Sequence, residues 1–181
     1  KDDGEEHRRQ DQEGGCEVKP CRAFEAGLVK VIRQYGEIGP GVRLSSFQNE
    51  AADAPVPKDE TRKFPIVAIR CTPPRADSDV SARLACDVVL LCATLLDDDM
   101  SRARLSSLYE GVQDVIDKLY FQGRASAGGE HLTAFKAAVA AEASGVDVWG
   151  VTLGEPVAPY DDDGVSTIGI GIRIHFTRND I

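Results

Sequence analysis

The stretch Ser81–Leu96, SARLACDVVLLCATLL, decides the fold of this chain. Taken at every second position, it has one apolar face, formed by Ala82, Leu84, Cys86, Val88, Leu90, Cys92 and Leu96. Its opposite face starts polar and then turns apolar at Val89, Leu91, Ala93 and Leu95. A helix is the competing interpretation, but the alternation, the β-branched residues and the flanking PP and DDD favour a strand. A strand that is apolar on both faces must be covered on both sides, so we predict the central strand of a sheet.

Hydrophobic periodicity predicts the elements on either side of this strand. Apolar residues at helical spacing predict helices over Lys19–Tyr35 and along the stripe Leu105–Tyr120, which Gly123 ends. The Ala-rich segment His131–Ala143 predicts a weaker helix. Further strands are predicted over 42–47, 64–71, 146–153 and 165–177. The segments 48–62, 72–79, 123–130 and 154–164 are predicted to be connections.

This element order predicts an α+β fold class, with a mainly antiparallel sheet of about four to five strands and two main helices packed on one face. Residues 1–17 form a charged N-terminal tail, and residues 18–181 form a single α+β domain. The second face of the central strand is then covered either by a local helix or by another subunit.

The composition restricts the function. A net charge of −9 and a pI of about 4.8 argue against a protein that grips nucleic acid phosphates, although DNA can slide past an acidic surface. The odd count of 5 cysteines indicates reduced thiols in a cytosolic compartment. The sequence contains no run of 18 or more apolar residues, so no transmembrane helix is predicted. The start KDDGEEHRRQDQ lacks the apolar core of a signal peptide.

Possible metal and nucleotide motifs have simpler explanations. The two DDD runs lack the spacing of a calcium loop and favour helix capping and turns over a weak divalent site. His7, Cys16 and Cys21 do not match zinc-ligand spacing. Gly169-Ile170-Gly171 lies inside an alternating strand, where glycine allows twist or the close approach of another backbone. We therefore expect no metal and no cofactor.

Catalytic residues are not expected either. No Gly-x-Ser-x-Gly motif occurs, and the cysteines on the apolar strand face are expected to be buried and inert. His131 at a helix start and His175 on the wet face of a strand are expected to be surface histidines rather than general bases. The sequence therefore predicts that the protein is not an enzyme.

Surfaces carry the functional prediction instead. Three segments are candidate contact elements: the charged tail, the connection 72–79 with Pro73-Pro74, and the long last strand. They favour a homo-oligomer whose subunits exchange arms or extend one another's sheets. The candidate subunit-interface residues are Val89, Leu91, Pro73, Pro74, Arg75, Arg173 and His175.

The order of these segments resembles a known family. A first helix AFEAGLVKVIRQYG, a strand FPIVAIRCTPP, a long strand, a helix LSSLYEGVQDVIDKLY, an Ala-rich segment and a closing strand pair follow one another over residues 20–178. This pattern resembles the tail-terminator or tail-completion (neck) proteins of tailed bacteriophages. The resemblance is one of element order, and no diagnostic motif carries it.

The resemblance implies a structural virion protein without catalytic residues. It implies a hexameric ring that joins the tail tube to the head connector, is assembled in the host cytoplasm, and lets DNA pass without specific binding. The long charged tail departs from the compact members of that family. Two other virion roles are near, a head-completion protein and the tube terminator of a contractile injection machine. The alternative class is a small cytoplasmic α+β module that recognises a peptide by strand addition.

Overall fold

A computed structural model describes residues 18–46, 64–77, 83–124 and 129–179 of the chain. The predicted charged tail 1–17 and the predicted loop 48–62 lie outside the described residues, as do His7 and Cys16.

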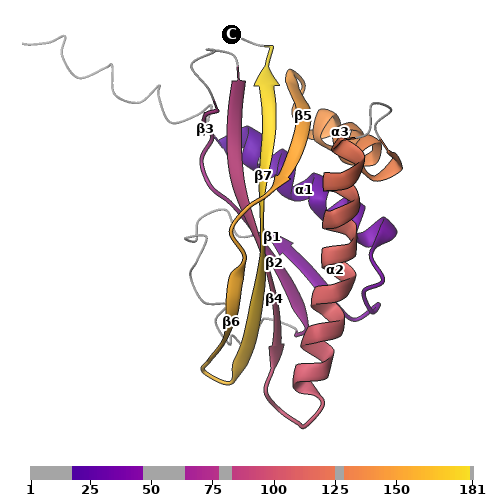
Figure 1. Ribbon diagram of the computed structural model, residues 1–181, viewed down its shortest axis with the longest axis vertical. Coiled ribbons are helices and arrows are strands. Elements are labelled where there is room, and N and C mark those ends of the chain that lie inside the picture. Colours follow the sequence, from indigo (N-terminus) through magenta and orange to yellow (C-terminus); the bar gives the residue numbers. More distant parts are fainter. Residues whose placement is uncertain (1–17, 47–63, 78–82, 125–128, 180–181) are drawn as a thin grey trace, which may run out of the picture.

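A seven-stranded mixed sheet forms one layer of the described part of the molecule (Figure 1). Its strands are β1 (Arg43–Ser46), β2 (Ile66–Cys71), β3 (Arg75–Ala76), β4 (Arg83–Leu95), β5 (Val146–Leu153), β6 (Val157–Asp162) and β7 (Val165–Arg178). The order is β1-β2-β4-β7-β5, with β3 paired to β4 and β6 paired to β7. All pairs are antiparallel except β1 with β2.

The two longest strands, β4 and β7, are the centre of the sheet. They pair without interruption from Arg83 opposite Thr177 to Leu95 opposite Val165. β4, which lies within the stretch Ser81–Leu96, is therefore a central strand, as predicted. Its alternating positions point to two different faces, so each face has its own set of partners.

Three helices pack on the same face of the sheet: α1 (Val18–Tyr35), α2 (Ser101–Arg124) and α3 (Glu130–Glu142) (Figure 1). The main core lies between these helices and the sheet. Phe24 of α1 meets Phe176 of β7 edge to face, with ring centroids 4.9 Å apart. Such aromatic contacts add to the stability that burial of apolar area supplies.

The opposite, helix-free face has a smaller apolar cluster. Its buried members are Ile66, Ala68, Leu91, Ala93 and Val165. The partly buried side chains of Phe64, Val89, Leu95 and Val157 pack against them. No described helix covers this face, so of the two predicted covers, a local helix and another subunit, the structure does not have the first.

Part of the helix-free face is covered by the chain itself, where residues 154–157 continue from β5 to β6 along one edge of β7 and lie over Gly169 and Gly171. The backbone N–H of Gly154 donates to the carbonyl oxygen of Gly171 at 2.8 Å. A Cβ on Gly169 would collide with Val157, and a Cβ on Gly171 would collide with the Glu155 carbonyl. The predicted close approach of another backbone is confirmed at Gly171, whereas at Gly169 the close approach is made by the Val157 side chain.

The predicted fold class is confirmed, but the described residues form more strands than expected. The segment 154–164, predicted as a connection, contains β6, and the described part of the predicted loop 72–79 contains the short strand β3. Both strands are exposed and rich in Pro, Asp or Arg, so they lack the apolar alternation that identifies a strand.

The DDD run before α2 has the predicted capping role. Asp98 accepts a hydrogen bond from the backbone N–H of Met100 at 2.8 Å, just before α2 begins at Ser101. Arg104 binds both Asp97 and Asp98, at 2.9 and 2.6 Å. Despite the cost of partial burial, hydrogen bonds from Met100 and Arg104 lower the pKa of Asp98. The carboxylates thus stabilise the positive end of α2.

Candidate functional site

A carboxylate shared by two arginines marks the centre of the helix-free face. Arg173 of β7 donates from Nε to Oδ1 of Asp87 at 2.7 Å, and Arg75 of β3 donates to the other oxygen. Asp87 and Arg173 are direct neighbours in the β4–β7 register, which fixes their approach. The hydrogen bond with Asp87 raises the pKa of Arg173. Because these side chains are partly exposed, each pair contributes at most about 1 kcal/mol to stability.

A groove with a volume of about 580 Å³ lies beside this ion-pair centre. It runs between β4, β7 and the segment 154–157 that follows β5, and its lining includes Val89, Leu153 and Glu155 together with the three charged residues. The arginines are already paired to Asp87, so the groove offers a mixed apolar and charged surface rather than an unfilled ion site. Such a surface suits a protein or peptide contact.

A hydrogen-bonded chain of three side chains lies at the upper part of the same face. His175 Nδ1 is 2.8 Å from Asp77 Oδ2, and His175 Nε2 is 2.8 Å from Thr152 Oγ1. The Trp149 ring lies against His175, with centroids 4.8 Å apart, and Arg83 lies over Trp149. The His175 side chain is only 11% exposed, so the expectation of a surface histidine is wrong here.

The order Thr152–His175–Asp77 resembles the hydrogen bonding of a nucleophile, base and orienting acid. Catalytic nucleophiles of this kind sit on a sharp turn, whereas Thr152 lies in the regular pairing of β5 with β7, opposite Arg173. These hydrogen bonds connect Asp77, the residue after β3, to His175 in β7 and to Thr152 in β5. We interpret this arrangement as a latch between strands.

The structure separates the predicted interface residues into three groups. Arg75, Arg173 and Val89 line the groove. Pro73 and Pro74 lie in the connection between β2 and β3, where Pro73 is exposed and Pro74 is half-buried, and His175 lies on β7 opposite Ala85. Leu91 is 0% exposed within the single chain, so it has no free surface for a partner.

Among the described residues, four large apolar side chains are exposed, and the sequence did not predict their exposure. Trp149 and Leu153 on β5 are 43% and 50% exposed. Leu96 and Met100, at the turn between β4 and α2, are 38% and 61% exposed. Hydrophobic periodicity does not indicate this exposure, because an exposed Leu at a strand end fits the same pattern as a buried one. The two pairs lie at different places in the molecule (Figure 1).

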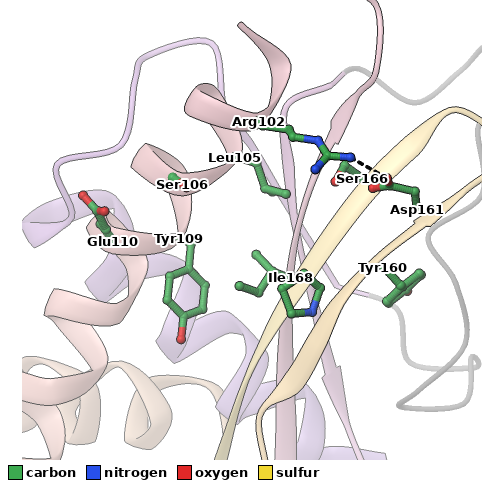
Figure 2. Close-up of a pocket in the computed structure, with 10 residues that line it drawn as sticks. Arg102, Leu105, Ser106, Tyr109, Glu110, Tyr160, Asp161, Ser166 and Ile168 are labelled. Atoms are coloured by element: carbon green, nitrogen blue, oxygen red, sulfur yellow. Dashed lines mark hydrogen bonds and ion pairs between the residues drawn. The ribbon is translucent and has the colours of Figure 1, made fainter. Parts of the chain in front are cut away.

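A second hollow, of about 390 Å³, separates the start of α2 from the β6–β7 hairpin (Figure 2). Figure 2 shows Tyr109 and Ile168 lining it, and the ion pair between Arg102 and Asp161, at 3.2 Å, at one end. The Tyr160 hydroxyl is buried without a hydrogen-bond partner among the described residues.

His131 corrects a second expectation about histidines. It is buried at the start of α3, where its ring lies 4.1 Å from the Tyr35 ring, centroid to centroid. Burial lowers the pKa of His131. It was predicted to be on the surface because a helix start is usually exposed, but α3 packs against α1 at this end.

Three cysteine thiols from distant parts of the sequence meet under α1. Cys86 Sγ lies 2.7 Å from Cys71 Sγ and 3.8 Å from Cys21 Sγ, and it donates to the Thr72 carbonyl oxygen at 2.7 Å. Cys92, on the same strand face as Cys86, lies outside this group, and burial raises its pKa to about 12. The cysteines on the apolar face are buried, as predicted.

The three thiols influence one another's ionisation. The neighbouring thiols of Cys71 and Cys86 lower the pKa of Cys21 to about 4, and the position of Cys21 in the first turn of α1 favours the same anion. The contact with Cys21 in turn raises the pKa of Cys71 and of Cys86. Of the three groups, Cys21 therefore loses its proton most readily.

Comparisons with known proteins identify no family. No protein-family model matches the chain, and no curated protein matches its sequence. Among the described residues, no helix is both long and apolar enough to cross a membrane.

Proposed function

We propose that this chain is a structural subunit of a closed ring, the tail terminator or tail-completion ring at the head–tail junction of a tailed bacteriophage. The proposal rests on the resemblance in element order and on one structural observation. The chain carries two different exposed apolar surfaces, Trp149 with Leu153 on β5 and Leu96 with Met100 at the β4–α2 turn.

Two unlike surfaces on one subunit suit a head-to-tail contact, in which one surface binds the other on the next copy. Repetition of such a contact by a fixed rotation closes a ring. β5 is an edge strand, with no partner on its outer side among the described residues, so a neighbour can also extend the sheet there. The resemblance implies six subunits, with the tail tube and head connector as further partners.

The acidic composition is compatible with this role. A net charge of −9 repels DNA phosphates, so a channel of such subunits lets DNA pass without specific binding. Among the described residues of the helix-free face, the charged groups Asp87, Arg75 and Arg173 pair with one another, and Thr152, His175 and Asp77 form the latch, so we propose a non-enzymatic role in the virion.

The second candidate is a module that binds a peptide by strand addition, favoured by the groove of about 580 Å³ next to the edge strand β5. Light scattering after size exclusion separates the two functions. We expect a particle of about six chains, and a ring by electron microscopy. A chain that stays monomeric at high concentration and in the presence of tail-tube ends contradicts the ring and leaves the peptide module.

Leu153→Asp tests which surface forms the ring. We expect this variant to fold and to remain monomeric, because it puts a charge on an apolar contact without touching the core. The matched control is Ser107→Asp, which adds the same charge on an exposed position of α2. If both variants assemble like the unmodified chain, the β5 surface is not the contact.

A further inference from the structure

Cys21, Cys71 and Cys86 are brought together by three separate elements. Cys21 lies in the first turn of α1, Cys71 is the last residue of β2, and Cys86 lies in β4. Their Sγ atoms all lie within 4.8 Å of one another. The β2–β4 pairing puts Cys71 opposite Val88, so that Cys71 and Cys86 are diagonal neighbours on the face that α1 covers.

These distances can be compared with a thiolate metal site. A zinc–sulfur bond of about 2.3 Å in tetrahedral geometry puts two sulfur ligands about 3.8 Å apart. The Sγ atoms of Cys21 and Cys86 already have this separation, 3.8 Å. Cys71 Sγ, 2.7 Å from Cys86 Sγ, needs to move away by about 1 Å. Rotation of one part-buried side chain at the end of a strand can supply such a shift.

We propose that Cys21, Cys71 and Cys86 form a binding site for a thiophilic d¹⁰ cation, with Zn²⁺ as the ion it holds. Three sulfur ligands select soft or borderline cations over Mg²⁺ and Ca²⁺, which bind oxygen. Each cysteine would bind as a thiolate, and any thiol proton would pass to solvent. The Thr72 carbonyl oxygen, 3.3 Å from Cys21 Sγ and 2.7 Å from Cys86 Sγ, would be available as a further ligand.

The surroundings of the site combine access with rigidity. Cys21 and Cys71 are part-buried, so an ion can enter from the side of α1, whereas Cys86 is buried and fixed by its strand. A bound cation would tie the start of α1 to β2 and β4. Its binding free energy would then add to the stability of the fold. The alternative of a Cys71–Cys86 disulfide leaves Cys21 without a role, and it is an outcome of the test.

The test is a titration of the full chain, reduced and freed of metal, with Cd²⁺ as a spectroscopic substitute for Zn²⁺. All proteins carry Cys16→Ser, so that the signal comes from the described thiols. We expect sulfur-to-cadmium absorption that saturates at one ion per chain, is displaced by Zn²⁺, and raises the melting temperature. Cys21→Ser and Cys71→Ser are each expected to weaken binding at least tenfold, since loss of a supporting outer residue already costs about 10–100-fold.

The matched control is Cys92→Ser, which removes a buried thiol from the same strand and face as Cys86 but outside the site. This variant should bind like the parent. If Cys86→Ser does not fold, Cys21→Ser at the part-exposed end of α1 still decides the question. The proposal is overturned by an absence of saturable absorption, by equal weakening in Cys92→Ser, or by a chain isolated with a Cys71–Cys86 disulfide that takes up no cadmium after reduction.

Discussion

The carbonyl oxygen of Glu155 lies directly against Gly171, at the place where any side chain on residue 171 would stand. This contact fixes the path of residues 154–156, which join β5 to β6 along one edge of β7. Val157, two residues further on, meets Gly169 with its side chain. The segment 154–157 therefore gives the helix-free face a local cover, and it shapes the groove next to Asp87.

Replacement of Gly171 by alanine should disrupt the packing of the segment 154–157 on β7. The new Cβ collides with the backbone of Glu155, which cannot move aside as a flexible side chain does. We expect a loss of about 2–3 kcal/mol in the free energy of unfolding, measured by denaturant titration. Gly150→Ala on β5 is the control, because a Cβ there meets no atom within 4 Å. Equal stability of the two variants would show that the segment 154–157 can move away from β7 without loss of stability.

Leu91 and Leu153 should respond differently to the same change. Leu91→Asp puts a charge into the buried cluster of the helix-free face, where Leu91 is 0% exposed. We expect it to unfold the chain, with a loss of roughly 4 kcal/mol or more. Leu153→Asp, at a position 50% exposed, should leave the melting temperature within a few degrees of the parent. A folded Leu91→Asp chain with parental stability would mean that this face is wet.

Most of the fold could be predicted from the sequence because its main elements have strong periodicity. The alternating apolar residues from Leu84 to Leu96 identified the central strand, and the stripe Leu105–Tyr120 identified α2. β6 was missed because the segment 154–164 contains Pro156, Pro159 and three consecutive aspartates. Its strand conformation comes from pairing with β7, which local propensity does not report.

The candidate sites were less accessible from the sequence, since they depend on contacts between distant elements. Asp87 and Arg173 become partners only through the β4–β7 register. The meeting of Cys21 with Cys71 and Cys86 depends on where α1 packs, and their spacing in the sequence matches no metal motif. The alternation of β4 did put Cys86 on the buried face, and that signal alone pointed toward the cluster.

The latch of Thr152, His175 and Asp77 should not catalyse hydrolysis. A working general base contributes roughly 10²–10⁴-fold to a rate, so His175→Gln would abolish most of any true activity. We expect no turnover of activated esters or peptides above buffer, in either the parent or His175→Gln. The assay uses Cys21→Ser chains, because a thiolate reacts with activated esters. Repeated turnover that His175→Gln removes without unfolding would make the protein an enzyme.

The latch should instead contribute to stability. Thr152→Val keeps the shape of the side chain but removes its hydrogen bond to His175. We expect a loss of about 1 kcal/mol in the free energy of unfolding. Ser107→Ala, at an exposed position on α2, is a control for the removal of a hydroxyl group away from the latch.

Cys21 should be the most reactive thiol among the described residues. Its lowered pKa, about 4, means that its thiolate fraction stays nearly constant as the pH falls from neutral to mildly acidic, and is lost only near pH 4. Cys92, with a pKa raised to about 12, should stay protonated and unreactive. Iodoacetamide labelling, followed by peptide mass spectrometry, measures each site. A Cys21 rate that falls tenfold per pH unit below neutral would contradict the lowered pKa of Cys21.

His131 should make the fold less stable as the pH falls below about 6.5. Burial against Tyr35 disfavours the imidazolium, and Lys118 disfavours it further, while Glu130 and Asp114 oppose this effect. The unfolded chain therefore takes up a proton near pH 6.5 before the folded chain does, and protonation favours unfolding. His131→Phe removes this proton while keeping an aromatic ring against Tyr35. Its free energy of unfolding should fall less than that of the parent between pH 7 and the folded pKa of His131. Parallel pH profiles of the two proteins would show that His131 titrates as it does in the unfolded chain.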